Sequence, residues 1–246
     1  MTSTSDPRQP FASTSSETSA VNPSTAIPTS STPSNHTTTT SGQDAPRQQS
    51  SAPAASASEL ASTKISLLGA LRSFPDFPIP GINFIDIMPL FQDPTIHASL
   101  LRALKLQVQE FGLSSDNTTV TKPDVIVGLD ARGFLFGPSL ALQFDASFVP
   151  VRKQGKLPGP CVTATYEKEY GADFFQMQEG AIKPGQKVLV VDDIIATGGS
   201  AAAAGSLVKQ LGGDLMGYLF ILEIPFLKGR EKLGGLPTVT LLETDS

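Results

Sequence analysis

Residues 190–200 read V-V-D-D-I-I-A-T-G-G-S and are the most informative stretch of this 246-residue sequence. An apolar strand ends in two adjacent carboxylates, Asp192 and Asp193, and a turn of small residues leads into a helix that begins at about Gly199 or Ser200. Glycine lets the backbone approach an anion closely, and the amides and dipole at a helix start favour negative charge. The stretch therefore predicts a strand, an anion-binding turn and a helix in succession.

The same stretch predicts which ligand would bind there. A phosphate fits against the turn, where Thr197 and Ser200 add hydroxyl donors. The two carboxylates would lie beside a sugar and accept hydrogen bonds from its vicinal hydroxyls, so the pattern is typical of a ribose 5-phosphate site. The alternative is an ordinary turn capped by Asp and Thr side chains. Two consecutive aspartates at the end of a buried strand disfavour it, because desolvated carboxylates need partners.

Outward from this stretch, short apolar strands alternate with helical segments. Strands are predicted over residues 124–129, 147–151, 187–191, 215–222 and 237–242, and helices over residues 60–72, 94–111, 137–144 and 200–211. Such alternation implies crossover connections and a mostly parallel sheet with helices on both faces. We therefore expect an α/β fold whose ligands bind beyond the carboxyl ends of the strands.

The N-terminal segment differs in composition. Residues 1–59 are rich in Ser, Thr and Pro, with Phe11 as the only aromatic side chain. Such a segment cannot bury enough apolar surface to offset the entropy of an ordered chain. We predict that residues 1–59 form a disordered tail, either regulatory or merely tolerated, and that residues 60–246 form one globular domain.

Charge and composition exclude several classes of protein. The formal net charge is −5, whereas nucleic-acid binders carry a basic domain or stripe. The single cysteine, Cys161, excludes an internal disulfide, and the two histidines are too far apart to suggest a zinc site. The start of the chain lacks the pattern of a secretory signal, and no apolar run reaches the roughly 18 residues of a membrane span. We expect a cytoplasmic protein that binds neither nucleic acid nor membranes.

Residues 192–200 resemble the 5-phosphoribosyl-1-pyrophosphate (PRPP) motif of type I phosphoribosyltransferases, and their form resembles the adenine-using members in particular. Further stretches resemble parts of those enzymes in the same order: residues 74–81 (F-P-D-F-P-I-P-G) the start of the base-binding hood, residues 128–138 (G-L-D-A-R-G-F-L-F-G-P) the pyrophosphate loop, residues 152–159 and 166–171 the ends of the mobile catalytic loop, and residues 228–233 (K-G-R-E-K-L) a C-terminal signature. The resemblance covers residues 60–243 and implies the family's twisted, mostly parallel sheet with a small N-terminal hood.

The resemblance also implies a reaction. Adenine and PRPP would give AMP and pyrophosphate, with Mg²⁺ bound mainly through the pyrophosphate of PRPP and not directly by the protein. It further implies a homodimer. Two alternatives remain open: transfer to another purine, and a non-catalytic PRPP-sensing regulator on the same fold.

Each implied substrate contact falls on named residues. The resemblance assigns the ribose 5-phosphate to Asp192, Asp193, Ala196, Thr197, Gly198, Gly199 and Ser200, and the pyrophosphate to Arg132, Lys153, Lys156 and Tyr170. The residue types fit this chemistry, because arginine in a glycine-containing turn can contact phosphate in a bidentate manner and lysines act as point charges. The peptide between Asp130 and Ala131 is expected to be cis by the same resemblance.

Residues 157–172 are predicted to form a lid. They are polar, contain two tyrosines and have glycines and prolines at their ends, and lids of this kind exclude water from the reaction. The resemblance places the catalytic acid, which would hold a proton near N7 of the purine, at Glu169. Glu167 is the alternative.

Adenine needs two apolar faces and a few directional contacts at its edge. The resemblance places Phe84 and Ile194 on the two faces, with the backbones of Asn83 and Ile85 at the edge. The sequence departs from the family at this point. The family commonly has arginine at the position of Ile85 and an apolar residue at the position of Asn83. Backbone recognition would survive both changes, whereas a role for the arginine side chain would not.

Overall fold

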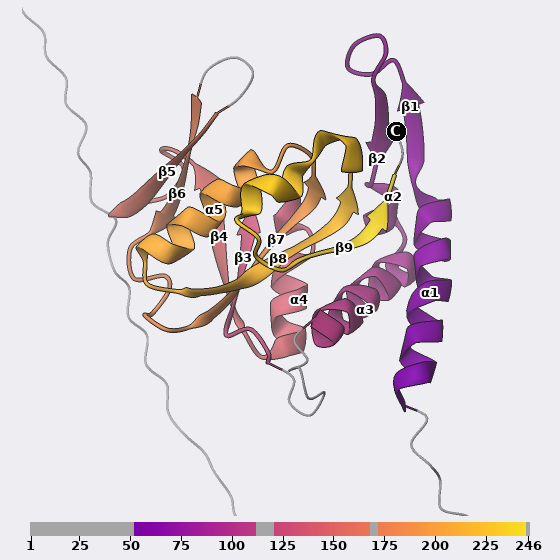
Figure 1. The fold of residues 1–246 in the computed structure, drawn as a ribbon, viewed down its shortest axis with the longest axis horizontal. Helices are drawn as coiled ribbons and strands as arrows, with labels where there is room; N and C mark the ends of the chain where they lie inside the picture. The colour runs from indigo at the N-terminus through magenta and orange to yellow at the C-terminus, as the bar shows by residue number, and fades with distance from the viewer. Residues whose placement is uncertain (1–51, 112–120, 168–171, 245–246) are drawn as a thin grey trace, which may run out of the picture. The chain divides into compact units, whose positions relative to one another are not determined.

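Two β-sheets organise the part of the chain that the computed structural model describes, namely residues 52–111, 121–167 and 172–244. The small sheet pairs β1 with β2, and the large sheet has seven strands in the order β5-β6-β4-β3-β7-β8-β9 (Figure 1). In chain order the elements are α1 (Ala52–Ala70), β1 (Arg72–Pro75), β2 (Asn83–Asp86), α2 (Pro89–Gln92), α3 (Pro94–Phe111), β3 (Val125–Leu129), the 3₁₀ helix η1 (Arg132–Phe134), α4 (Gly137–Phe144), β4 (Ser147–Lys153), β5 (Cys161–Glu167), β6 (Ala172–Gln178), β7 (Lys187–Ile195), α5 (Gly199–Gln210), β8 (Asp214–Glu223), the 3₁₀ helices η2 (Pro225–Leu227) and η3 (Gly229–Leu233), and β9 (Thr238–Glu243).

The centre of the large sheet is parallel. Neighbouring strands from β4 through β3, β7 and β8 to β9 all run in the same direction. Only the β5–β6 hairpin is antiparallel, and it joins the sheet through two residue pairs between β6 and β4. The predicted α/β fold with a mostly parallel sheet is therefore confirmed, and the carboxyl ends of β3, β7 and β8 lie at one edge.

Helices cover both faces of this sheet, as the apolar strands require. The side chains of β7 alternate between two cores. On one face Val188 and Val190 pack in a cluster with Ala204 and Leu207 of α5. On the other face Leu189 and Val191 belong to a cluster with the buried side chains of α1, α3 and α4. None of the described helices is long and apolar enough to cross a membrane.

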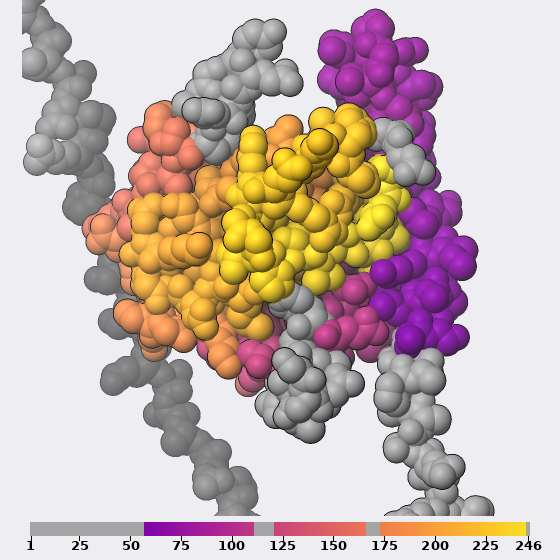
Figure 2. Space-filling model, in the orientation of Figure 1, coloured from indigo at the N-terminus to yellow at the C-terminus, as the bar shows by residue number. Residues whose placement is uncertain are grey.

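The hood, residues 72–86, is the antiparallel pair β1–β2 and its connecting turn. Phe74 pairs with Phe84 in the ladder, and the Asp76 carboxylate accepts a hydrogen bond from the Gly81 amide at 2.8 Å. Apolar side chains at the turn remain uncovered, with Phe77 53% and Ile79 61% exposed. In Figure 2 the hood projects beyond the body of the domain. An isolated two-stranded sheet is marginally stable, and Ile85 of β2 ties the hood to the domain by packing against the core cluster of α1, α3 and α4.

Two predicted elements, the first helix and the strand that begins at Lys187, have different bounds in the structure. The first helix begins at Ala52 and ends at Ala70, whereas the sequence predicted residues 60–72, so Arg72 begins a strand. Its first two turns precede the predicted domain boundary, because alanine favours a helix even in a Ser-rich segment. Strand β7 continues through both aspartates to Ile195, because its ladder with β8 continues to the pair Ile195–Glu223.

The hairpin β5–β6 was not predicted as strands. Within β6, Phe175 and Met177 are buried at alternate positions, which is the pattern of a half-buried strand. The prolines, glycines and polar residues of residues 157–172 obscured that pattern. The lid prediction falls partly on residues 168–171, which lie outside the described residues, as does nearly all of the predicted tail.

Candidate active site

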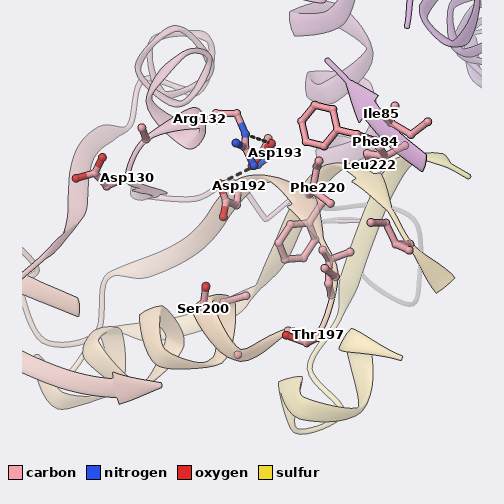
Figure 3. Close-up of a pocket in the computed structure, with 18 of the residues that line it drawn as sticks. Phe84, Ile85, Asp130, Arg132, Asp192, Asp193, Thr197, Ser200, Phe220 and Leu222 are labelled. Carbon is pink, nitrogen blue, oxygen red and sulfur yellow. Dashed lines mark hydrogen bonds and ion pairs between the residues drawn. The ribbon is translucent and has the colours of Figure 1, made fainter. Parts of the chain in front are cut away.

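One cavity of about 450 Å³ opens where the hood faces the carboxyl ends of β3, β7 and β8 (Figure 3). The residues that line it come from seven parts of the chain: Ile82, Asn83, Phe84 and Ile85; Asp130, Ala131 and Arg132; Lys153; Phe175; Asp192, Asp193, Ile194 and Ile195; Ala196, Thr197, Gly198, Gly199, Ser200 and Ala201; and Phe220, Leu222 and Ile224. Its volume suits a small-molecule ligand. The cavity thus brings together residues that the sequence assigned to the ribose 5-phosphate, to the pyrophosphate and to the base.

The phosphate loop, residues 196–200, forms one wall of the cavity. Gly198 has a φ of 77° and is the N-cap of α5, where no side chain caps the helix. The first backbone amides of a helix have no hydrogen-bond acceptor within the helix. The first amides of α5 belong to residues that line the cavity, so they can donate to a ligand there. Thr197 and Ser200 add hydroxyl groups beside the same wall (Figure 3). This arrangement binds anions by backbone amides and helix dipole together.

Asp193 holds Arg132 at the cavity. The carboxylate is 3% exposed and accepts a short hydrogen bond from Arg132 Nε (Figure 3). Burial alone would lower the pKa of Arg132, but the charge and hydrogen bond of Asp193 outweigh it and raise the pKa of Arg132 above its ordinary value. The guanidinium therefore stays charged, fixed by one nitrogen and half exposed. It is placed to meet an anionic ligand.

Asp192 has a different environment from its neighbour. Its Oδ1 accepts a hydrogen bond from the Asp193 amide at 2.9 Å, and η1 approaches it closely enough that a Cβ on Gly133 would lie 3.5 Å from that oxygen. Burial, and after it the charge of Asp193, raises the pKa of Asp192 well above its ordinary value. A ligand that donates hydrogen bonds to Asp192, or brings positive charge to it, would relieve this cost of ionisation.

The pyrophosphate loop, residues 128–138, connects β3 to α4. The peptide between Asp130 and Ala131 is cis, as the resemblance implied. Asp130 Oδ2 accepts a hydrogen bond from Arg152 Nε at 3.0 Å. Phe148 of β4 fills the space under the loop, so closely that a Cβ added to Gly128 would lie 2.7 Å from its ring. No local pattern pointed to Phe148 as a support, because its role depends on the order of strands.

Of the two lysines that were both assigned to pyrophosphate, the structure places only one at the cavity. Lys153 lines the cavity, and its Nζ lies 3.8 Å from Asp173 Oδ2. Lys156 is exposed and is absent from the lining, and its carbonyl accepts a hydrogen bond from Arg152 Nη1 at 3.3 Å. Glu169 and Tyr170, assigned to the catalytic acid and to the lid, lie outside the described residues.

The apolar wall of the cavity combines the hood with the sheet. Phe84 extends from β2 toward Asp193 (Figure 3) and contacts Phe77 edge-to-face at 5.2 Å between ring centroids. Opposite the hood, the ladder places Phe220 beside Asp192 and Leu222 beside Ile194. Neither β8 residue was expected at the cavity, since only the pairing of β8 with β7 brings them there.

The carboxylates at the cavity fit the magnesium ion that the family resemblance implies. No cluster of three or more His, Cys, Asp or Glu side chains able to hold a metal occurs within the described ranges. Mg²⁺ characteristically keeps several waters and binds through one or two carboxylates together with substrate phosphates. Asp192 is the carboxylate here without an arginine hydrogen bond of its own, so the donor set suits an ion that a phosphorylated substrate would bring.

Comparisons with known proteins agree with this geometry. The phosphoribosyl transferase domain family matches residues 100–222. Adenine phosphoribosyltransferase from Yarrowia lipolytica is 59% identical over 176 residues, which cover 72% of this chain and 93% of the relative. The mouse enzyme of the same name is 47% identical, with coverage of 71% and 93%.

A solved structure gives the same picture. Adenine phosphoribosyltransferase from Saccharomyces cerevisiae, in complex with an imino-altritol bisphosphate and adenine, is 53% identical and has a TM-score of 0.69. The match covers 74% of this chain and 99% of that one. The chain therefore belongs to the adenine phosphoribosyltransferase family.

Proposed function

We propose that this chain catalyses the reaction of adenine with PRPP to give AMP and pyrophosphate. One observation carries the proposal: a single cavity joins a helix-start phosphate loop, two adjacent carboxylates, a fixed arginine and an apolar hood. These groups match the phosphate, ribose, pyrophosphate and base of the two substrates. Family membership supports the same reaction, and the base is the one named in the relatives.

The phosphate loop binds the 5-phosphate of PRPP through its backbone amides and the hydroxyls of Thr197 and Ser200. Asp192 accepts hydrogen bonds from the ribose hydroxyls, which favours its ionised form despite burial. Asp193 contributes by fixing Arg132. The two carboxylates thus have separate tasks, one toward the sugar and one toward the arginine.

In the reaction, N9 of adenine forms a bond to the anomeric carbon while the bond from that carbon to pyrophosphate breaks. Negative charge builds on the leaving group, and preorganised cations aimed at it lower the barrier. Arg132 and Lys153 supply that charge at the cavity, and Lys156 and Tyr170 join them when the lid closes. Mg²⁺ bound through the pyrophosphate of PRPP, with Asp192 as the available carboxylate, would neutralise further charge on the leaving group.

Phe84 and Ile194 enclose the adenine ring, and the backbones of Asn83 and Ile85 recognise its edge. Glu169 donates a proton to N7 as N9 loses its own proton to solvent, so that the neutral base attacks through a free N9, and the N7 proton returns to Glu169 as the new bond forms. Replacing Glu169 with Gln should lower kcat by about 100-fold or more and change both KM values far less. Full turnover in that variant, with loss in Glu167→Gln, would move the role to Glu167.

The protein is further proposed to be a homodimer, as the family resemblance implies, and to lie in the cytoplasm, as the sequence led us to expect. Light scattering on the full chain tests the oligomeric state, and a monomeric mass at assay concentrations would refute it.

The function is tested by AMP formation from adenine, PRPP and Mg²⁺ with the full-length chain, beside hypoxanthine and guanine at equal concentration. Adenine should be the preferred base by kcat/KM. Faster turnover of another purine would overturn the assignment of the base. No turnover of any base, with PRPP still raising the Tm, would indicate a sensor instead of an enzyme.

A further inference from the structure

The C-terminal turn, residues 228–233, lies directly against the phosphate loop although it lines no part of the cavity. It contains η3 and the K-G-R-E-K-L stretch, to which the proposed reaction gives no task. A Cβ added to Gly198 would lie 2.2 Å from the Gly229 carbonyl oxygen. A Cβ added to Gly229 would lie 2.3 Å from the Ala196 carbonyl oxygen and 3.0 Å from the Gly198 nitrogen. Backbone therefore packs on backbone at this contact, and the Ile195 side chain lies beside it, with Cγ1 at 2.7 Å from the Cβ added to Gly229.

The contact restricts the phosphate loop at the point that matters for anion binding. Gly198 is the N-cap of α5, so a shift of its backbone changes the direction of the first helix amides. Gly229 has no positive φ, unlike Gly198 at 77°. The small size of residue 229, and not its backbone conformation, is therefore what the contact requires.

Arg230 fastens the turn to the sheet. Its Nε donates to Glu223 Oε1 at 2.7 Å, and its Nη2 makes a short hydrogen bond to Glu223 Oε2. The same guanidinium donates to the Thr238 carbonyl at 2.7 Å and to Thr240 Oγ1 at 3.0 Å. One side chain thus ties the turn to the end of β8 and to β9 in a planar, bidentate arrangement that lysine cannot reproduce.

Glu223 connects this network to β7. It is 7% exposed and pairs in register with Ile195, the last residue of β7 before the phosphate loop. The hydrogen bonds from Arg230 lower the pKa of Glu223 below its ordinary value. The carboxylate is therefore ionised at neutral pH, and losing its arginine would leave a buried charge unpaired.

We infer that Arg230 is a positioning residue for the phosphate loop: it anchors the C-terminal turn so that the Gly229 backbone supports Gly198 and fixes the amides that receive the 5-phosphate. The inference deepens the proposed function and depends on it for the identity of the substrate. It concerns the binding of the sugar phosphate and not of the base.

The first test is Gly229→Ala beside Gly69→Ala, in which the added methyl meets no atom within 4 Å. Gly229→Ala should raise KM for PRPP about tenfold or more, since small displacements of positioning groups are costly, with KM for adenine changed less than about twofold. The Gly69 control should leave both values unchanged. An unchanged KM for PRPP in folded Gly229→Ala protein would overturn the inference.

The second test uses the anchor, in case Gly229→Ala does not fold. Arg230→Lys should raise KM for PRPP, and Arg230→Met should raise it further, while Lys232→Met, at another exposed position of the turn, should not. A fall in Tm with no selective change for PRPP would show a merely structural role and refute the assignment.

Calorimetric titration with ribose 5-phosphate separates this inference from the proposed function. Weaker binding in Gly229→Ala than in the unaltered chain supports the loop contact even if no base turns over. Equal binding in both proteins overturns it even if AMP formation is robust.

Discussion

The two sides of the cavity are built in opposite ways. The phosphate side is formed by strands whose side chains are almost fully buried, by backbone packed on backbone at Gly198 and Gly229, and by ion pairs with a buried carboxylate. The base side is a two-stranded hood with exposed apolar side chains at its turn. The phosphate side suits a charged group of fixed geometry. The base side suits a flat apolar ring that packing alone can hold.

This difference predicts where substitutions act. Substitutions on the phosphate side should raise KM for PRPP and lower Tm together, because the groups that bind the ligand also belong to the core. Changes on the hood should affect adenine with little cost in stability, because few buried contacts are lost.

The largest effect is expected for Gly198→Ala. The methyl would lie 2.2 Å from the Gly229 carbonyl oxygen, and alanine disfavours the φ of 77°. We expect kcat/KM for PRPP to fall by about 100-fold or more, together with a lower Tm. Steady-state kinetics and a thermal melt test both, and Gly180→Ala, with a φ of 76° but no neighbour within 4 Å of the added methyl, measures the strain alone. Equal losses in the two variants would show that the contact with Gly229 is unimportant.

Replacing Arg132 with Met should lower kcat by about 100-fold, the size of effect seen when one donor to a developing negative charge is removed. The melting temperature should also fall, since Asp193 stays buried without its partner. Arg102→Met removes a surface pair with Glu59 and serves as the control. Retention of full turnover would remove Arg132 from the pyrophosphate site.

On the hood, Phe84→Ala should raise KM for adenine about tenfold, as expected when about 1.4 kcal/mol of binding is lost. The KM for PRPP and the Tm should change little, because the residue lies on a two-stranded sheet that is only partly buried. Ile79→Ala, at the exposed turn of the hood, is the matched control. A comparable rise for PRPP would show that hood and phosphate loop are not independent.

Asp192→Asn should stabilise the unliganded protein at neutral pH and weaken the binding of PRPP. A carboxyl whose folded pKa is raised binds more protons folded than unfolded, so its contribution to stability decreases as pH rises above its unfolded pKa. Asparagine avoids this loss, and a gain of about 1 kcal/mol would raise Tm by about 2–4 °C. The gain should shrink toward pH 4, where the unaltered residue is protonated. A lower Tm at pH 7 would contradict the assignment of a destabilising charge to Asp192.

The smallest effect is expected for Ile85→Arg, which restores the residue common in the family. If the backbone of β2 recognises the edge of adenine, KM for adenine should change less than about threefold, well under 1 kcal/mol. A tenfold improvement would show instead that the family's arginine contributes through its side chain, and that this chain has lost the contact.

The order of elements and the phosphate loop could be predicted from the sequence because their signals are local. Apolar runs of β-branched residues predict β3 and β7, and glycines followed by a helix predict the turn at residues 196–200. The hairpin β5–β6 was missed, because polar and proline-rich residues flank its alternating pattern and its pairing with β4 is antiparallel in an otherwise parallel sheet.

The sequence by itself thus determined the α/β class, the phosphate loop and the residue types needed for a sugar phosphate, since each depends on spacing along a few residues. Only the tertiary structure decided that Asp193, and not Asp192, holds Arg132, because these two residues are separated by 61 positions. It likewise decided that Phe220 and Leu222 reach the cavity and that Gly229 supports Gly198. Contacts of this kind depend on strand order and register, which no local pattern of residues specifies.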